Sequence, residues 1–375
     1  MYQIVSTDDY MPMPINNAEE YTKVVSVSWY NPPEGQERAE DLTYPCVLPF
    51  SQMYPLVCID IRNFLNQIYL FSDDHFRHTT VIDKTLKESL DELLVDKVCR
   101  SLVDRLSSQY PGQIVQILTN LDHFEMACKD LEDLLVEARS SSSAAGAIKL
   151  NATNQFDSAK KRAEKRIFEL VNSKIDDLID TAEYDWISTY VPDTASPYIQ
   201  ELTRYLSNTI NTVLLGLPEH IKELIYFEAL KHVCEQLLSL PLDPNVRQIS
   251  PQAVTAYKLD VDDLVGYVES LPEAPMLLES LVPLQQTTDL MSLAAEGKGE
   301  EFFDSSKSNL RFGKVDKIKG AELLEKVLTA PPEPAPRRER MSLLPEFGEL
   351  SKKPSMPHFG DFRDRFGQFG KRDKS

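Results

Sequence analysis

The stretch that decides the fold runs from Ile114 to Leu135 and reads IVQILTNLDHFEMACKDLEDLL. Its main apolar residues recur in steps of three and four positions, which matches the 3.6-residue turn of an α-helix. These residues are Ile114, Leu118, Leu121, Phe124, Cys128, Leu131 and Leu135. We therefore expect one apolar stripe to face a partner helix, with Gln116, Asn120, Lys129 and Glu132 facing water.

The same pattern recurs along most of the chain. Long amphipathic stretches cover residues 80–107, 157–182, 197–214, 218–240 and 250–269. Further helices are expected at 18–29, at 51–71, within 276–295 and at 321–328. Strand-like alternation and short tandem repeats are not apparent in the sequence. The predicted fold class is all-α, an elongated stack of two antiparallel helical bundles with a disordered C-terminal tail.

Two breaks in the helical pattern divide the chain. The stretch from Tyr184 to Pro197 has no helical period and contains Trp186 and two prolines, which indicates a boundary between bundles. After residue 330 the composition shifts to proline, charged residues and isolated phenylalanines, as is typical of a disordered tail. We predict an N-terminal bundle at 1–185, a C-terminal bundle at 186–329 and a tail at 330–375.

The charge of the chain is strongly and unevenly negative. The whole sequence carries 40 Lys and Arg against 59 Asp and Glu, a net charge of -19. Residues 311–375 hold 15 basic and 10 acidic residues, so the preceding part holds 25 and 49 and has a net charge of -24. An acidic body argues against binding to nucleic acid, which requires a basic surface.

Cysteine usage and hydropathy indicate a cytoplasmic protein. The five cysteines form no Cys-x-x-Cys pair, and Cys99 and Cys128 fall in helical stretches, as expected for buried free thiols in a reducing compartment. Apolar runs remain well short of the ~20 residues that cross a bilayer, and the polar N-terminus does not resemble a signal peptide. We expect membrane contact only through partners or the tail.

The most metal-like cluster is Asp73-Asp74-His75-Phe76-Arg77-His78. His75 and His78 could share one face of a helix, but a third ligand is not evident nearby and Arg77 would repel a cation. A polar loop between helices is therefore favoured over a metal site. Motifs for metalloproteases, nucleotide-binding loops or hydrolases do not occur. We predict a protein that is not an enzyme, with no catalytic residue, cofactor or metal.

Two surface features remain as candidates for binding. The first is the apolar excess on the stretches 226–240 and 250–268, which indicates either a partner surface or burial under a further helix. The candidate contact residues there are Tyr226, Phe227, Leu230, Leu237, Leu238, Val254, Tyr257, Lys258 and Leu259. The second is the tail, where four phenylalanines lie among basic residues. A plain disordered end is favoured there over a short helix in weak contact with anionic lipid.

Several motifs closely resemble the Sec-fifteen subunit of the exocyst, called exocyst component six in animals. In the first half they are Asp9-Tyr10-Met11-Pro12, Val115-Gln116-Ile117, Asn120, His123, Glu125, Ala127-Cys128-Lys129 and Leu131-Glu132-Asp133. In the second half they are Tyr184-Asp185-Trp186, Ala195-Ser196, Tyr198, Gln248-Ile249-Ser250, Ala253-Val254 and Leu259-Asp260-Val261. The resemblance covers about residues 5–328 and includes polar positions as well as apolar ones.

The resemblance implies a function in secretion. It implies a helical subunit of the complex that tethers secretory vesicles to the plasma membrane before fusion, peripheral at both membranes and beside other subunits, with a Sec-ten neighbour expected. It also implies that this chain is the C-terminal half of a longer protein, so that Met1 is a truncated start or a fragment boundary. In this family the C-terminal half binds a GTP-loaded Rab GTPase.

We place the Rab contact on the nine candidate residues as a hypothesis. Replacing Leu230 or Leu259 by Asp is expected to weaken binding of the GTP-loaded Rab without loss of helicity. Animal members tend to carry Asn where this chain has Lys258, which leaves the choice of Rab open. The first alternative is a scaffold piece of the exocyst without Rab binding. A metal-dependent hydrolase built on His75 and His78 is a more distant alternative.

Overall fold

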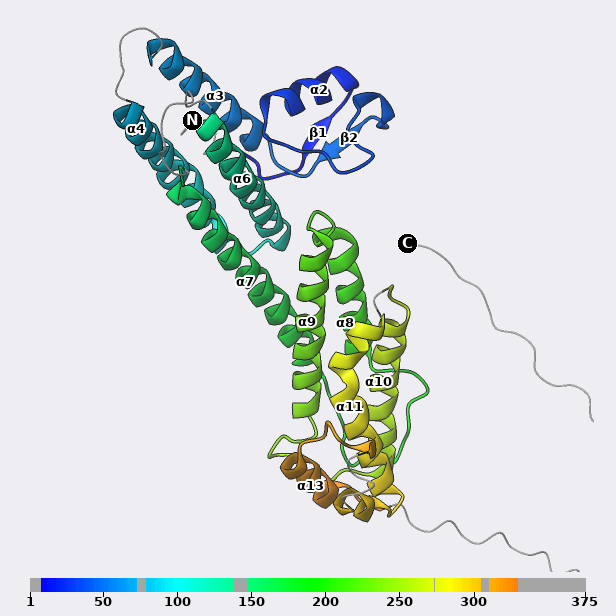
Figure 1. Ribbon diagram of the computed structural model, residues 1–375. Helices are drawn as coiled ribbons and strands as arrows, with labels where there is room; N and C mark the ends of the chain where they lie inside the picture. Colours follow the sequence, from blue (N-terminus) through cyan, green and yellow to red (C-terminus); the bar gives the residue numbers. More distant parts are fainter. Residues whose placement is uncertain (1–7, 73–78, 138–147, 273, 305–309, 330–375) are drawn as a thin grey trace, which may run out of the picture. The chain divides into compact units, whose positions relative to one another are not determined.

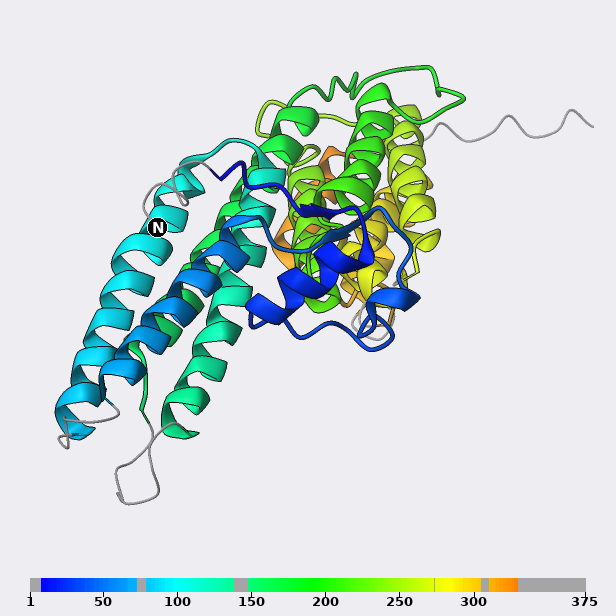
Figure 2. The ribbon, with the colours of Figure 1, turned by 90° about the horizontal axis from the view of Figure 1, so that it is seen from above.

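The computed structural model describes residues 8–72, 79–137, 148–272, 274–304 and 310–329. The described part is predominantly helical, which confirms the predicted all-α class (Figure 1). Its first long helices are α3 (Met53–Ser72), α4 (Thr79–Asp91), α6 (Pro111–Glu137) and α7 (Asn151–Ile179). In two perpendicular views α3, α4 and α6 lie side by side (Figure 2).

The stripe predicted over residues 80–107 forms one nearly continuous helical run. After α4 the chain continues through a π-helical segment (Glu92–Cys99), α5 (Arg100–Asp104) and a 3₁₀ turn (Arg105–Ser107). Its apolar residues recur every four positions, which is more than the 3.6 residues of an α-helical turn. The wider π-helical turns compensate for this drift and keep Leu94 and Val98 in the core.

The second half of the described chain is built from further helices. They are α8 (Pro197–Asn208), continued by a π-helical turn (Thr209–Val213), α9 (Glu219–Ser239), α10 (Pro251–Glu269), α11 (Ala274–Ala295) and α13 (Lys317–Lys326). A 3₁₀ turn lies at Gly299–Phe303. The predicted start at Ser250 is confirmed, because its hydroxyl caps α10 by accepting the N–H of Ala253 at 3.1 Å.

The N-terminal segment departs from the prediction, which included no strands. Strands β1 (Met13–Ile15) and β2 (Cys46–Leu48) form a two-stranded antiparallel sheet. They flank α2 (Ala18–Val27) and a 3₁₀ turn (Ala39–Asp41). Strands of three residues are too short to show alternation in a sequence, and these two pair across a long connection.

The outward face predicted for α6 is largely wrong. Gln116, Asn120 and Glu132 are buried, and only Lys129 reaches water. The physical reason is that α6 packs on more than one side, against α7 and also against α3 and the segment before it. Each of the three buried polar side chains has hydrogen-bond partners, as burial of a polar group requires.

The contacts among the described residues up to Thr329 form one compact unit. Within it, α7 contacts both α6 and α9. The predicted division into bundles at 1–185 and 186–329 therefore stays a prediction. The tail at 330–375 lies outside the described residues, so both the predicted disordered end and the less favoured lipid-contacting helix stay predictions. His75 and His78 also lie outside the described residues.

Candidate partner-binding surface

Most of the predicted contact residues lie in the interior. Buried members are Tyr226, Leu230, Leu237, Val254 and Tyr257. The Tyr257 hydroxyl of α10 donates to the Leu237 carbonyl of α9 at 2.8 Å, so these residues join the two helices. Leu230 is fully buried, which makes Leu230→Asp a disruption of the core rather than a probe of the surface.

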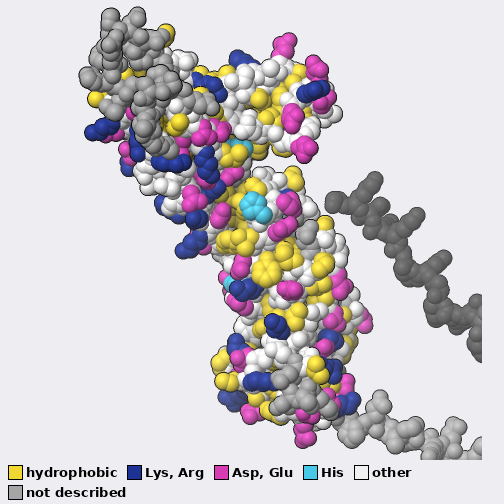
Figure 3. All heavy atoms as spheres, in the orientation of Figure 1, with side chains coloured by type: hydrophobic (Ala, Val, Ile, Leu, Met, Phe, Trp, Pro, Cys, Tyr) yellow, Lys and Arg dark blue, Asp and Glu magenta, His cyan; other side chains and the backbone are white. Residues whose placement is uncertain are grey.

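Four of the predicted residues are partly exposed. Phe227 and Leu238 lie on α9, and Lys258 and Leu259 lie on α10. Leu224, which the sequence interpretation missed, is half exposed and precedes Phe227 by three positions, so the two share one side of α9. Figure 3 shows hydrophobic side chains interspersed with charged ones over this half of the chain. Of the nine predicted contact residues, only these four are accessible to a partner, and their role in binding stays a prediction.

Lys258 is held by carboxylates of its own chain. Its ammonium nitrogen lies 3.1 Å from Asp289 of α11 and 3.5 Å from Asp262 one turn further along α10. Burial acts to lower the pKa of Lys258, but the two carboxylates outweigh it and raise the pKa above its ordinary value. A partner that contacts Lys258 must therefore compete with Asp289 and Asp262 for this charge.

The motifs from residues 184–198 and 248–261 meet in one buried cluster. Asp260 of α10 accepts hydrogen bonds from the Ser196 N–H at 2.6 Å, from the Ser196 hydroxyl at 2.7 Å and from the Tyr184 hydroxyl. The hydroxyls of Tyr184 and Tyr198 lie 2.6 Å apart. This cluster attaches the connection between α7 and α8 to α10.

Ser250 makes a second attachment beside that cluster. Its N–H donates to the Trp186 carbonyl at 2.7 Å, and its hydroxyl donates to the Ser188 carbonyl at 2.6 Å. The Trp186 ring packs against Tyr184 and Tyr257, with centroids 4.8 and 5.8 Å away. Trp186 therefore packs within the chain on one side and stays partly exposed.

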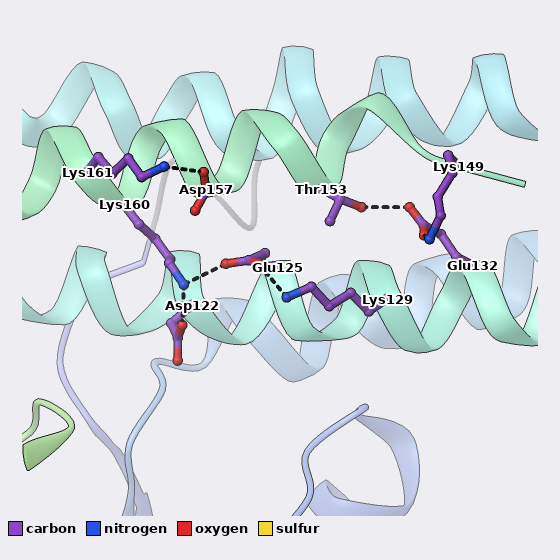
Figure 4. A network of polar contacts seen from close by, with 9 residues as sticks. All are labelled: Asp122, Glu125, Lys129, Glu132, Lys149, Thr153, Asp157, Lys160 and Lys161. Carbon is purple, nitrogen blue, oxygen red and sulfur yellow. Dashed lines mark hydrogen bonds and ion pairs between the residues drawn. The ribbon is translucent and has the colours of Figure 1, made fainter. Parts of the chain in front are cut away.

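A charged network joins α6 and α7 along their length (Figure 4). Lys160 of α7 lies 2.6 Å from Asp122 and 2.5 Å from Glu125, both on α6, and Lys129 lies 2.5 Å from Glu125. Burial acts to raise the pKa of Glu125, but Lys129 and Lys160 outweigh it, so the pKa is lowered and the group stays ionised. These contacts align the two helices in antiparallel register.

Carboxylates from two other helices cap the first turn of α7. Its N-cap residue, Leu150, has no side chain that could accept a hydrogen bond. Instead, Glu132 of α6 accepts the Leu150 N–H at 2.9 Å and the Thr153 hydroxyl at 2.8 Å, and Asp91 of α4 accepts the Ala152 N–H at 2.9 Å. Negative charge at a helix N-terminus also stabilises the helix dipole.

His123 of α6 and His232 of α9 have structural surroundings. His123 packs among the rings of Tyr30, Phe50 and Tyr54, at centroid distances between 5.2 and 5.6 Å. Its pKa is lowered to about 4, chiefly because burial disfavours the charged ring. His232 lies 2.6 Å from Asp176. Polar side chains of the resembling motifs thus serve packing and alignment within the chain.

The described residues contain no group of three or more His, Cys, Asp or Glu side chains placed to hold a metal ion. Within the same ranges, every helix is too short or too polar to span a bilayer. The apolar and charged side chains of α9 and α10 can contribute contacts to a partner.

The chain is similar to known proteins over most of its length. The family model described as "Exocyst complex subunit Sec15 C-terminal" matches residues 1–326. Exocyst complex component sec15 of Schizosaccharomyces pombe is 30% identical over 334 residues, which are 85% of this chain and 41% of that protein. Exocyst complex component 6 of Rattus norvegicus is 30% identical over 294 residues, 76% of this chain and 36% of that protein.

A solved structure has the same fold. The crystal structure titled "Crystal Structure of Sec15 C-terminal domain" aligns with a TM-score of 0.55 at 20% identity, covering 78% of this chain and 90% of that one. Its helical architecture agrees with the fold described above. The present chain spans about two fifths of the length of the curated relatives it matches.

Proposed function

Because this chain belongs to the Sec15 family of exocyst subunits, we propose that it takes part in tethering secretory vesicles to the plasma membrane before fusion. The observation that carries this proposal is the match of the Sec15 C-terminal family model to residues 1–326. An exocyst subunit acts by binding other proteins and is not an enzyme. On this proposal the protein is cytoplasmic and associates with vesicles and sites of exocytosis through its partners.

The proposal includes recognition of a GTP-bound Rab GTPase on the vesicle. The γ-phosphate and its magnesium ion order the switch loops of a GTPase, so only the GTP state presents the ordered surface. A complementary helical face then gains binding free energy from that state alone. The partly exposed residues Leu224, Phe227 and Leu238 of α9, and Lys258 and Leu259 of α10, support the proposal, because they leave apolar side chains and a cation accessible to a partner.

The test is capture of secretory-vesicle Rabs by the immobilised chain, with each Rab loaded with a non-hydrolysable GTP analogue or with GDP. We expect capture in the GTP state only, and at least about fivefold weaker capture by Phe227→Asp and Leu259→Asp. The matched control is Ile318→Asp on α13, which adds the same charge at an exposed apolar position. Circular dichroism of each variant separates loss of contact from loss of fold.

Equal capture in both nucleotide states would contradict the Rab proposal. Unchanged capture by Phe227→Asp and Leu259→Asp, with nucleotide dependence retained, would place the contact elsewhere.

Lys258→Asn changes the charge without adding bulk, and we expect it to alter the preference among Rabs because Asp289 and Asp262 lose their cation.

The second candidate function is a structural scaffold piece of the exocyst that does not bind a Rab. Family membership supports other exocyst subunits as partners, with a Sec-ten subunit proposed as the neighbour. Affinity capture from cytosol with a GTP analogue or GDP separates the two functions. Retention of exocyst subunits irrespective of nucleotide, without any Rab, favours the scaffold.

A further inference from the structure

An open groove of about 880 Å³ lies between the connection that follows α7 and the connection from α9 to α10. Trp186 and Ile187 line it from the first connection, and Val246 and Gln248 line it from the second. These residues are separate from those proposed to contact a Rab. The groove is therefore an additional candidate binding site.

The groove is held open by contacts that do not require a ligand. The Ser250 N–H and hydroxyl bind the carbonyls of Trp186 and Ser188, which fixes the first connection against the start of α10. The Ile249 N–H donates to the Lys326 carbonyl at 2.8 Å, which fixes the end of the second connection. A preformed groove lowers the entropy cost of binding a segment in it.

The charge around the groove is negative. Glu183, Asp185 and Asp243 line it, against one cation, Arg247. Residues 175–203, which include the first connection, contain seven Asp and Glu and no Lys or Arg. Glu183 and Asp185 are exposed, so their charges reach solvent. Electrostatic complementarity therefore favours a cationic occupant and opposes phosphate groups of nucleic acid or anionic lipid.

Exposed apolar side chains accompany these carboxylates. Ile187 is 66% exposed and Tyr190 on the same connection is 65% exposed. Trp186 adds a partly exposed aromatic ring in the groove. An occupant that matches this lining carries apolar as well as basic side chains.

We propose that the groove binds an extended, lysine- or arginine-rich segment of a partner protein, with apolar side chains between the basic ones. Its cations would lie near Glu183, Asp185 and Asp243, and its apolar side chains would cover Trp186 and Ile187. This site is independent of the Rab contact, so either proposal can fail without the other.

The test measures binding of a short fluorescein-labelled peptide of alternating arginine and valine to the full chain by fluorescence anisotropy. The double variant Glu183→Gln, Asp185→Asn removes two charges, and its amide at 185 can still accept the Ile187 N–H. We expect affinity to fall about tenfold, and a further loss with Ile187→Ser. The matched control is Asp177→Asn, Asp180→Asn, which removes the same charge outside the groove lining.

Three results would overturn the proposal. The first is an affinity of the groove variant within twofold of the unchanged chain. The second is an equal loss in the control variant, which would show attraction by net charge alone. The third is equal binding of the counterpart peptide with glutamate in place of arginine, or of phosphatidylserine vesicles, which the carboxylates should repel.

Discussion

Asp260 and Ser196, 64 positions apart, are joined by two hydrogen bonds to the same carboxylate. One carboxylate oxygen accepts the Ser196 N–H at 2.6 Å and the other accepts its hydroxyl at 2.7 Å. Because Asp260 is almost fully buried, these bonds and the one from Tyr184 replace its hydration. The pair therefore holds the long connection before α8 onto α10.

Replacing Asp260 by Asn should destabilise the chain by about 2–3 kcal/mol. The amide nitrogen cannot accept a hydrogen bond, so at least one of the partly buried donors on Ser196 and Tyr184 loses its bond to residue 260. A shift of the urea midpoint measures the effect. Asp263→Asn, at an exposed position of the same helix, serves as the control and should change the midpoint little. A midpoint for Asp260→Asn equal to that control would show that the pair contributes nothing.

Replacing Glu132 by Gln should weaken the cap of α7 and lower stability by about 1–2 kcal/mol at pH 7. Burial acts to raise the pKa of Glu132, but Lys149, the Leu150 N–H and the Thr153 hydroxyl outweigh it, so the pKa is lowered. A carboxyl group whose pKa is lowered in the folded chain stabilises the folded state at every pH above its ordinary pKa. This stabilisation is lost as the pH falls through the pKa of the folded chain.

The difference in stability between the Glu132→Gln variant and the unchanged chain should therefore become smaller at acid pH. Urea midpoints at pH 7 and below pH 4 measure it. Asp133→Asn, an exposed neighbour on α6, provides the control. A difference that is equal at both pH values would assign the effect to shape rather than to the charge of Glu132.

Replacing Asn120 by Leu should detach the segment before α3 from α6. Asn120 donates to the Ser51 hydroxyl at 2.8 Å and accepts the Ser51 N–H at 2.9 Å, so a leucine leaves both Ser51 groups buried without these bonds. We expect a loss of about 2–4 kcal/mol and faster cleavage within residues 31–45 in limited proteolysis. Asn211→Leu changes an exposed asparagine in the same way. Unchanged cleavage would show that other contacts hold the segment.

Replacing His123 by Phe should remove a pH dependence of stability. The pKa of His123 is lowered from 6.5 to about 4 by burial, so the unfolded chain takes up a proton that the folded chain excludes. The free energy of unfolding is therefore unaffected by the protonation of His123 above pH 6.5. It falls as the pH drops toward 4, by up to about 3 kcal/mol, because protonation of His123 favours the unfolded chain.

Phenylalanine cannot titrate and fits among the surrounding aromatic rings. The stability of the His123→Phe variant relative to the unchanged chain should rise between pH 7 and pH 4.5, as measured by urea unfolding. His220→Gln, at an exposed histidine, should show no such trend. A constant difference across this range would mean that His123 is not the group responsible.

The helices of this protein were predictable because each has its own apolar periodicity or capping residues within its own sequence. The stripe from Ile114 to Leu135, and the Ser250-Pro251 start of α10, depend on residues within one or two turns of each other. The exposure of Gln116, Asn120 and Glu132 was predicted wrongly, because it depends on what packs against the opposite side of α6. The strands β1 and β2 were not predicted because each is three residues long and pairs with a strand some thirty residues away in the sequence.

The candidate contact surface illustrates the same limit. The apolar excess on the stretches 226–240 and 250–268 predicted either a partner contact or burial under a further helix. Tyr226, Leu230 and Tyr257 follow the second alternative, because they are buried where α11 packs against α9 and α10. Conversely, the groove beside Trp186 is lined by residues from a stretch without helical periodicity, which predicted only a boundary between bundles.

The sequence by itself determined the helical class, the positions of the long helices and the membership of the Sec15 family, because these follow from local periodicity and from matching motifs. Only the tertiary structure decided which side chains face water and which distant residues meet. Burial is a property of every element that packs against a residue, and the pairing of Asp260 with Ser196 or of Glu132 with Leu150 arises only once those elements are in place.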